Sequence, residues 1–439
     1  MERRVVAMQA KVLNVFMNGR HVGQLTKSAS RRLAWTYEDA WCDLAGARPI
    51  SLSLPLAQRK LDSECVYHFF DNLLPDSPLM RARIRDLFHL PTDEPFDLLA
   101  GIGKECVGAL QIVENREPLP DTFLYQPLTE KESAAILRNT GAYPLGMSTY
   151  ADDFRLSLAG VQEKAAFLYW KGQWNRPRGQ TPTTHIFKPP IGDIQHQNMD
   201  LSDSCENEWL CSCIASAFGL PVAPSEIQYF EDVKVLIVER FDRKCSEDGS
   251  RIIRLPQEDL CQALGLSRHL KYQADGGPDI ETIMRLLLGS ACSHHDRDLF
   301  FRTQVLFWLL AAIDGHAKNF SLFLEAGGKY RLTPLYDILS VHPLMASGQL
   351  HIKKIKMAMA LHGKNNHYHW DDMQHRRFIE TAKAVHYSVQ SASRILEEML
   401  AKVDVVIERV SSKLPQTFPH RIAEPIFEGM REAKRRLLL

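Results

Sequence analysis

An aspartate and an asparagine in the last third of the chain have the types and spacing of a phosphate-transfer site. The segment Asp314-Gly-His-Ala-Lys-Asn319 follows an apolar run at 305–313. Its D-x-x-x-x-N spacing is that of a kinase catalytic loop, in which the aspartate accepts the substrate hydroxyl proton and the asparagine binds magnesium. Asp337 follows a predicted hairpin over 320–337. Because a hairpin brings its strand ends together, we expect Asn319 and Asp337 to bind one metal ion.

A lysine and a glycine further upstream could bind the phosphates of a nucleotide. The segment 184–188 is a predicted strand that ends in Lys188, and a strand-borne lysine can pair with phosphates. Glu208, rather than Glu206, is the expected partner of Lys188 on the next helix, although both could belong to an ordinary polar face. Gly160 lies between two predicted strands, where backbone amides could bind phosphate but a simple turn is the commoner role. The glycines that precede a lysine lack the spacing of a Walker loop.

Each of these features has an ordinary structural explanation when it is taken alone. Asp314 could cap a helix, Asn319 could fill a turn and Asp337 could begin a loop. Their order along the chain is more specific. A glycine loop, a strand lysine, a hinge-like segment at 239–242, the D-x-x-x-x-N loop and a second aspartate follow one another as in a two-lobed kinase. The joint pattern therefore favours a kinase.

Two other functions fit parts of the sequence. His294-His295-Asp296, with Asp314 and His316, could form a metal-dependent phosphohydrolase site that uses water. A non-catalytic, DNA-associated regulator is the second alternative, because the C-terminal third contains local basic clusters that could contact phosphates. These clusters are Lys353, Lys354 and Lys356, then Arg376, Arg377 and Lys383, and finally Lys434, Arg435 and Arg436.

The composition limits the class of protein. The 439 residues are 45% hydrophobic and 24% charged, which is typical of a globular protein and excludes fibrous or mainly disordered classes. Lys and Arg together number 53, as do Asp and Glu, so no global field attracts nucleic acid or an anionic membrane. The apolar runs are too short to cross a bilayer. We expect a cytoplasmic protein without a membrane partner, whose 9 cysteines are reduced.

The elements that must position these residues indicate an α+β protein of three regions. We expect a β-rich N-terminal domain at 1–125, a small mixed α/β nucleotide-binding lobe at 126–255 and an all-helical C-terminal lobe at 256–439. Asn18-Gly19 predicts a type I′ hairpin turn, and a linker is expected at 114–126. Strands are predicted at 50–56, 155–158, 165–170, 184–188 and 234–239, and helices at 204–218, 257–264, 280–288, 300–313, 376–385, 391–411 and 424–438.

Seven motifs are spread along nearly the whole chain. They are FFDNLLPD at 69–76, DFRLSLAGVQEK at 153–164, TTHIFK at 183–188, VERFDR at 238–243, RLPQED at 254–259, DGHAKN at 314–319 and PLYD at 334–337. Together they resemble the motifs of the HipA family, the kinase toxins of HipBA toxin–antitoxin modules. The resemblance implies a two-lobed, protein-kinase-like fold and a serine/threonine protein kinase that uses ATP and Mg²⁺.

The resemblance also implies roles for the matching residues. Asp314 would be the catalytic base, and Asn319 with Asp337 would be the magnesium ligands. Ser157 matches the autophosphorylated serine of the family, where an added phosphate would repel ATP or pull the phosphate loop outward. The ATP-binding residues would be Ala159, Gly160, Val161, Gln162, Glu163 and Lys164 of the phosphate loop, Lys188, the hinge residues Glu239, Arg240 and Phe241, and His316, Ala317, Lys318, Asn319, Tyr336 and Asp337.

The same resemblance implies the partners. The expected substrate is glutamyl-tRNA synthetase, whose phosphorylation would arrest growth and lead to persistence. A HipB-like helix-turn-helix antitoxin would bind the chain and bring it to operator DNA as a co-repressor. The DNA-contacting positions of the family fall near Lys383 and His386. A histidine at the second position, where a family member has arginine, implies a weaker or pH-dependent DNA contact.

Overall fold

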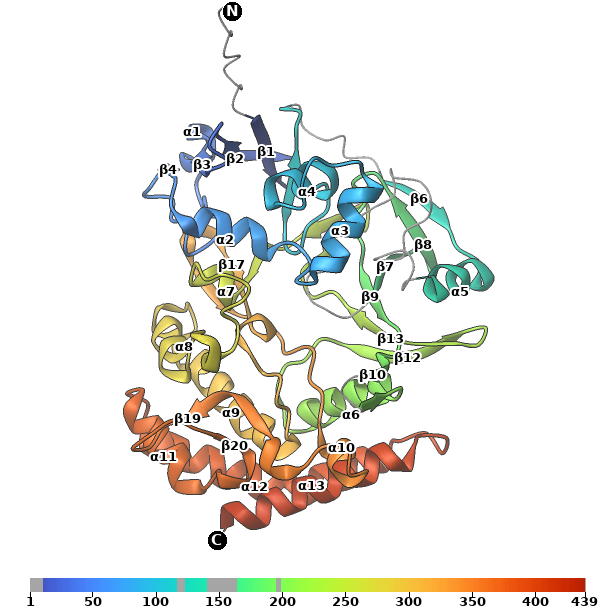
Figure 1. Ribbon diagram of the computed structural model, residues 1–439, viewed down its shortest axis with the longest axis vertical. Coiled ribbons are helices and arrows are strands. Elements are labelled where there is room, and N and C mark those ends of the chain that lie inside the picture. The colour runs from blue at the N-terminus through green and yellow to red at the C-terminus, as the bar shows by residue number, and fades with distance from the viewer. Residues whose placement is uncertain (1–10, 117–122, 140–163, 195–198, 439) are drawn as a thin grey trace, which may run out of the picture. The chain divides into compact units, whose positions relative to one another are not determined.

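The computed structural model describes residues 11–116, 123–139, 164–194 and 199–438 (Figure 1). The chain divides into two compact units, each assembled from segments that are distant in the sequence. Unit 1 comprises residues 1–187, 240–268 and 322–329, and unit 2 comprises residues 188–239, 269–321 and 330–439.

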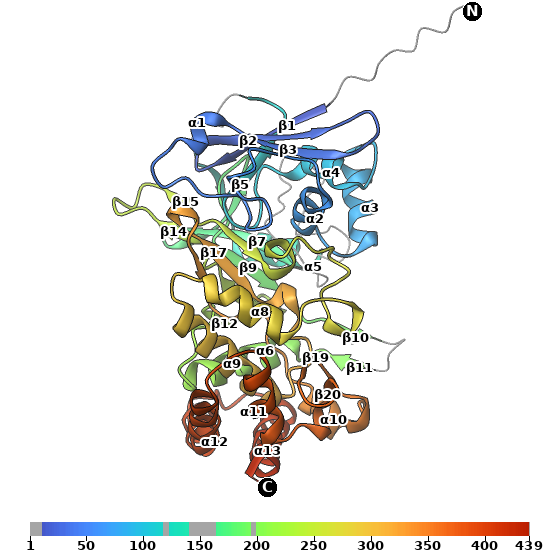
Figure 2. The ribbon, with the colours of Figure 1, turned by 90° about the vertical axis from the view of Figure 1, so that its left-hand side faces the viewer.

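Unit 1 begins with an antiparallel sheet whose strand order is β4-β3-β2-β1-β5 (Figure 2). The β1–β2 turn has positive φ values at Asn18 (46°) and Gly19 (78°), as a type I′ turn requires, so the predicted hairpin is confirmed. Short helices accompany the sheet. The elements are β1 (Lys11–Met17), β2 (Arg20–Lys27), β3 (Leu33–Tyr37), α1 (Asp39–Cys42), β4 (Lys60–Leu61), α2 (Glu64–Asn72), α3 (Pro78–Leu87), α4 (Pro95–Ile102) and β5 (Leu110–Val113).

The core of this sheet is apolar and continuous. Residues of β3 alternate between buried and half-buried, and Trp35 packs against Phe70 of α2. The prediction of a strand at 50–56 is wrong, because backbone amides of this segment donate to side chains instead of to a neighbouring strand. The Ile50 amide donates to the Tyr37 hydroxyl at 2.9 Å, and the Leu52 amide donates to Glu258 Oε1 at 2.9 Å.

The rest of unit 1 contains a second group of antiparallel strands, in which β8 lies between β6 and β7, and β7 pairs with β9. Residues 257–264, predicted to be helical, instead begin as the strand β16. Asp259 ends that strand and caps the helix that follows, with its side chain accepting from the Gln262 amide at 2.9 Å. The elements are β6 (Leu124–Pro127), α5 (Glu130–Arg138), β7 (Ala165–Trp170), β8 (Gln173–Arg178), β9 (His185–Lys188), β14 (Arg243–Cys245), β15 (Ile252–Arg254), β16 (Gln257–Asp259), α7 (Leu260–Ala263) and β17 (Ser321–Leu324).

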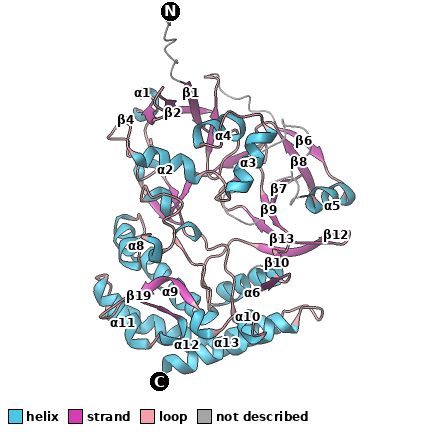
Figure 3. Cartoon of the chain, viewed as in Figure 1, coloured by secondary structure: helices cyan, strands magenta, loops and turns pink. Residues whose placement is uncertain are grey.

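Unit 2 is largely helical (Figure 3). Its central helix α9 is buried along its C-terminal half and packs against α12 and α13. Ala311, in the left-handed conformation with φ +47°, ends α9. Apart from 257–264, each predicted helix corresponds to a helix of this unit, and α10 was not predicted. The helices are α6 (Ser204–Ala217), α8 (Ile280–Leu286), α9 (Ser293–Leu310), α10 (His342–Ala346), α11 (His375–Ala384), α12 (Val389–Ser411) and α13 (His420–Leu438), with short 3₁₀ turns at 273–275, 287–289, 317–319, 352–354 and 370–372.

The α+β fold class is confirmed. The prediction of an all-helical C-terminal lobe is wrong in one respect, because strands also occur in unit 2. Met357 to Leu361 are all buried, and this short apolar run forms the strand β19 of a hairpin. The strands are β10 (Gly192–Ile194), β11 (Met199–Leu201), β12 (Ser225–Phe230), β13 (Val233–Glu239), β18 (Tyr330–Leu332), β19 (Lys356–Leu361) and β20 (His367–His369).

The structure agrees with two further expectations about the chain. Each of the 9 cysteines has a free thiol. Among the described residues, every helix is too short or too polar to span a membrane.

Candidate active site

Lys188, the last residue of β9, lies at the centre of the candidate site in unit 2. Its Nζ donates to Glu208 Oε1 at 2.7 Å and to Asp337 Oδ1 at 2.8 Å. Glu206 instead accepts from Lys234 at 2.7 Å, so the preference for Glu208 is confirmed. The lysine and the second aspartate of the predicted constellation, which are 149 positions apart, are therefore in direct contact.

The two carboxylates around Lys188 differ in burial. The Glu208 side chain is 6% exposed, whereas that of Asp337 is 40% exposed. Burial alone would lower the pKa of the Lys188 ammonium, but the charges of Asp337 and Glu208 outweigh burial and raise this pKa above its ordinary value. Lys188 is therefore a permanent cation, with a buried partner on one side and an accessible partner on the other.

The loop from Asp314 to Asn319 folds back on itself after α9. Asn319 Nδ2 donates to the Asp314 carbonyl at 2.6 Å, and the His316 amide donates to the same carbonyl at 2.8 Å. The Asp314 side chain is 57% exposed. Its Oδ1 accepts from the Tyr272 hydroxyl and lies 3.8 Å from His316 Nε2. Both contacts are made by Oδ1, and neither involves Oδ2.

Tyr336 connects this loop to Asp337. Its hydroxyl donates to the Lys318 carbonyl at 2.8 Å and lies 2.6 Å from Ser321 Oγ. The residue before Asp337 therefore contacts residues on both sides of Asn319, as expected for the two ends of a hairpin. Asp337 has φ +59°, a left-handed conformation that is uncommon outside glycine and that occurs at functional sites.

The side chains of Asn319, Asp337 and His316 have the atom types that a metal ion and a nucleotide would need. Asn319 and Asp337 supply amide and carboxylate oxygens, which are the ligand types that Mg²⁺ prefers. His316 is buried, and burial lowers the pKa of its imidazole, so the ring is neutral near pH 7. Within the described residues, its buried Nδ1 has no hydrogen-bond partner, which leaves a polar atom for a ligand to satisfy.

The expected hinge segment has its side chains engaged within the protein. Arg240 donates to both oxygens of Asp242, at 2.9 and 2.6 Å, and to Thr183 Oγ1 at 2.9 Å. Phe241 packs edge-on against Phe323, with ring centroids 5.7 Å apart. The amide of Glu239 donates to the Pro224 carbonyl at 2.8 Å. The Arg240 side chain is therefore occupied, and its backbone amide donates to the Thr184 carbonyl at 2.9 Å.

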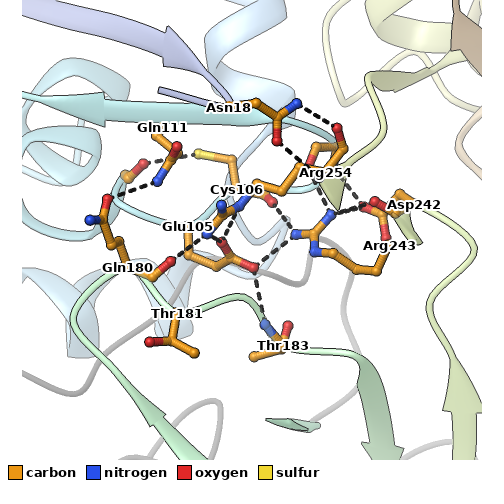
Figure 4. Close-up of polar contacts among 12 residues, drawn as sticks. Asn18, Glu105, Cys106, Gln111, Gln180, Thr181, Thr183, Asp242, Arg243 and Arg254 are labelled. Carbon is orange, nitrogen blue, oxygen red and sulfur yellow. Dashed lines mark hydrogen bonds and ion pairs between the residues drawn. The ribbon is translucent and has the colours of Figure 1, made fainter. Parts of the chain in front are cut away.

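A buried ion-pair network in unit 1 supports this segment (Figure 4). Glu105 accepts from Arg243 Nη2 at 2.8 Å and from Arg254 Nε at 2.8 Å. The amide of Gly108 donates to Asp242 at 2.8 Å. Burial alone would raise the pKa of the Asp242 carboxyl, but Arg240 and Arg243 hold it well below its usual range. The conformation after β13 is thus fixed by charge pairs that are shielded from water.

Other predicted residues lie elsewhere or outside the described residues. Lys164, half-buried, directly precedes β7. Lys383 and His386 are exposed, and Arg297 donates to the His386 carbonyl at 3.1 Å. Ser157, Ala159, Gly160, Val161, Gln162, Glu163 and the predicted strand at 155–158 lie outside the described residues.

Two of the features that suggested other functions have structural roles. Asp296 is buried, accepts from the Ser290 hydroxyl and accepts from the Leu332 amide at 3.0 Å, so its carboxylate is used within the fold. Lys434 pairs with Asp404 at 2.6 Å, while Arg435 and Arg436 pair with Glu432 at 2.9 and 3.0 Å. The C-terminal basic cluster is therefore largely neutralised by acidic neighbours.

Sequence reasoning missed two residues that support the site. Tyr272, which contacts Asp314, belongs to an irregular segment without a periodic pattern, and its ring packs edge-on against His316 at 4.9 Å. Asn207 is next to Glu208 on α6. Its Nδ2 donates to the Ser340 carbonyl at 2.8 Å, and its Oδ1 accepts from the Ser340 amide at 2.9 Å. A buried polar position beside Glu208 is the one signal that could have pointed to Asn207.

Two family models match the chain. The HipA N-terminal domain matches residues 13–113, and the HipA-like C-terminal domain matches residues 156–407, more than half of the chain. The first match covers most of the first sheet, and the second contains Lys188, Glu208, Asp314 and Asp337 of the candidate site.

Individual proteins are similar over most of their length. The protein Y4mE of Sinorhizobium fredii, which is named as a kinase, is 34% identical over 341 residues, covering 76% of this chain and 78% of that protein. The serine/threonine-protein kinase toxin HipA of Shewanella oneidensis is 29% identical over 304 residues, 67% of each chain. A solved complex of Shewanella oneidensis HipA, HipB and operator DNA matches with a TM-score of 0.81 at 22% identity over 97% of both chains, a likeness of fold.

Proposed function

The chain belongs to the HipA family of kinase toxins, and from this premise we propose that it is a serine/threonine protein kinase that transfers the γ-phosphate of ATP to a protein hydroxyl. The observation that carries the proposal is the position of Lys188 between Glu208 and Asp337, at 2.7 and 2.8 Å. A lysine that is permanently charged, and that is held by one buried and one accessible carboxylate, is well placed to bind phosphate oxygens.

The reaction assigns a separate task to each side chain. Lys188 compensates the charge of the phosphates, and Glu208 keeps the ammonium in place. Asp314 orients the serine hydroxyl of the substrate and accepts its proton on Oδ2 while the oxygen attacks the γ-phosphorus and ADP leaves. Tyr272 fixes the orientation of the Asp314 carboxylate by donating to Oδ1.

Asn319 and Asp337 would hold Mg²⁺, which supplies charge neutralisation at the triphosphate when it is bound. His316, Ala317, Lys318 and Tyr336 would contact the nucleotide. The hinge residues Glu239, Arg240 and Phe241 would contact the adenine, and the loop from Ala159 to Lys164 would bind phosphates through its amides.

Self-phosphorylation at Ser157 is the proposed means of control. A phosphate group carries a charge of about −1.5 to −2 near pH 7. Placed just before the proposed phosphate loop, it would repel ATP or pull the loop outward.

The proposed partners follow from the named relatives. The Shewanella oneidensis HipA is named as a kinase toxin, and its solved complex contains HipB and operator DNA. By the same logic, this chain would bind a HipB-like antitoxin and, as a co-repressor, operator DNA near Lys383 and His386. Its substrate would be glutamyl-tRNA synthetase, and loss of that enzyme's activity would arrest growth and allow persistence.

Incubation with γ-labelled ATP and Mg²⁺ tests the self-phosphorylation directly. The full chain should label itself at Ser157, whereas Ser157→Ala should bind ATP without taking up label. Label at another site in Ser157→Ala would contradict the assignment of this serine. Adding purified glutamyl-tRNA synthetase to Ser157→Ala tests the substrate, because transfer should then appear on the synthetase alone.

A further inference from the structure

Three metal-ligating side chains of unit 2 converge outside the candidate active site. Among the residues that the structure describes, Asp279, Glu281 and His362 each place one possible ligand atom within 4.8 Å of the other two. We propose that these three residues bind a divalent transition-metal ion of the zinc class. The proposal is separate from the kinase reaction and uses none of its residues.

The positions of the three ligands are set by contacts that do not involve a metal. Asp279 caps α8, and its Oδ1 accepts from the Thr282 amide at 2.8 Å and from the Thr282 hydroxyl at 2.7 Å. Oδ2 takes no part in these two hydrogen bonds and is available as a ligand atom. Glu281 follows in the first turn of the same helix. His362 comes directly after β19, and its amide donates to Thr381 Oγ1 at 2.8 Å. The secondary structure therefore preorganises the ligands before an ion arrives.

The imidazole of His362 provides a second, independent indication. Its Nε2 is inaccessible to solvent and has no hydrogen-bond partner within the described part of the chain. Buried polar atoms in proteins are almost always bonded, and one that is not requires an explanation. A metal ion bound by the ring would supply the missing partner, because neutral imidazole is the commonest protein ligand for such ions.

The donor set selects the class of ion. One imidazole nitrogen and two carboxylate oxygens suit zinc and its neighbours, whereas magnesium and calcium prefer oxygen alone. The two negative charges match one divalent cation. At zinc–ligand bonds near 2.0–2.2 Å, tetrahedral donors lie about 3.3 Å apart, so ligand atoms that lie within 4.8 Å of one another need to approach by at most about 1.5 Å. Three protein ligands leave the fourth position to water.

One charged neighbour competes for the site. Arg285 pairs with Glu281 Oε1 on the helix surface, and its own side chain is 73% exposed. Exposed pairs at this spacing contribute little to stability, and Glu281 Oε2 is not part of the pair. The ion pair therefore does not prevent Glu281 from binding a metal.

A bound metal ion would strengthen the existing connection between α8 and β19. Gln273 Oε1 accepts from the Ala360 amide of β19 at 2.7 Å, which ties the segment before α8 to this strand. An ion between Asp279 and His362 would add a second tie between the same two segments. Tyr272, the residue next to Gln273, contacts Asp314, so the metal would reinforce the support of that tyrosine.

The test uses the full chain, stripped with a chelator and then titrated with Zn²⁺ against a chromophoric competitor in excess Mg²⁺. We expect one tight equivalent. His362→Ala and Asp279→Asn should each weaken binding by tenfold or more. His369→Ala is the matched control, because His369 is exposed on β20 of the same unit, and it should bind as the unchanged chain does.

Co²⁺ supplies a spectroscopic readout. The expected spectrum has d–d bands and lacks the sulfur-to-metal charge-transfer band of cysteine ligands. Circular dichroism confirms that each variant is folded. If His362→Ala does not fold, Asp279→Asn decides, because asparagine still caps α8 but loses the charge. Equal affinity in the ligand variants and the control, a thiolate band, or no binding by the unchanged chain would overturn the proposal.

Discussion

At the scale of single residues, the account depends on the unequal surroundings of the two carboxylates at Lys188. Glu208 is buried and fixes the ammonium, whereas Asp337 is accessible and can exchange the ammonium for a ligand. Removing the buried charge should therefore displace the lysine while the proposed metal ligands Asn319 and Asp337 are not substituted.

Glu208→Gln should lower the rate of phosphate transfer by about 100-fold, the usual result of misplacing one group in an active site. The rate is measured with labelled ATP. Glu206→Gln is the matched control, since Glu206 lies on the same helix as Glu208 but pairs with Lys234 of β13. Equal losses in the two variants would show that helix stability, and not the position of Lys188, is responsible.

Tyr272→Phe isolates the contribution of one hydroxyl that we consider a positioning group. Loss of its hydrogen bond to Asp314 should reduce kcat by a factor of about 3 to 10, while KM for ATP stays the same. Steady-state kinetics separates the two parameters. A change in KM alone would mean that Tyr272 acts in nucleotide binding instead.

The residues with proposed chemical roles could be chosen from the sequence, because Lys188, Asp314, Asn319 and Asp337 follow one another in the order of a two-lobed kinase. Their helpers were not predictable. Tyr272 approaches Asp314 from 42 positions away through an irregular segment, and Glu105 meets Arg243 across 138 positions. Neither contact leaves a local pattern, since both depend on how the chain folds back.

At the scale of elements, α6 and the segment after Asp337 must keep a fixed distance for Lys188 to reach both carboxylates. Asn207 provides this connection through paired hydrogen bonds with the backbone of Ser340. A buried amide that satisfies both backbone groups of one residue behaves as a clamp.

Asn207→Ala should reduce the free energy of unfolding by about 2–4 kcal/mol, because it leaves a buried donor and acceptor of Ser340 unsatisfied. Urea unfolding measures the loss. Asn366→Ala, at an exposed loop position of the same unit, should change stability by less than about 0.5 kcal/mol. A similarly small effect at Asn207 would contradict the clamp.

The elements that repeat a pattern were predictable, and those set by tertiary contacts were not. Helical spacing identified α6, α9, α11, α12 and α13 to within several residues at their ends. Residues 50–56 have the alternating pattern of a strand, but the amides of Ile50 and Leu52 donate to the side chains of Tyr37 and Glu258. The local sequence does not indicate such partners, because they are distant along the chain. The strand β16 was mistaken for helix because it is too short to show a period of two.

At the scale of the whole molecule, equal numbers of positive and negative side chains leave pH effects to individual buried groups. Glu258 is the clearest case in unit 1. Burial raises the pKa of its carboxyl to about 8, from an ordinary value of 4.5. Between these values the folded chain retains a proton that the unfolded chain has lost. Stability therefore falls as pH rises from about 4.5 to about 8, and this contribution is constant above that.

Glu258→Gln should remove this part of the pH dependence. Between pH 6 and pH 8 the unchanged chain should lose about 2–3 kcal/mol of stability that the variant keeps, at about 1.4 kcal/mol for each pH unit. Urea unfolding of both proteins across this range gives the difference directly. Parallel curves would show that Glu258 does not titrate in this window.

The central claim, that the chain phosphorylates protein hydroxyls with Asp314 as the base, is tested most directly by mass spectrometry after incubation with γ-labelled ATP, Mg²⁺ and a cell lysate. The unchanged chain should place label on protein serine. Asp314→Asn should bind ATP with nearly unchanged affinity and place none. Equal labelling by Asp314→Asn, or release of inorganic phosphate by the unchanged chain without labelled protein, would contradict the claim.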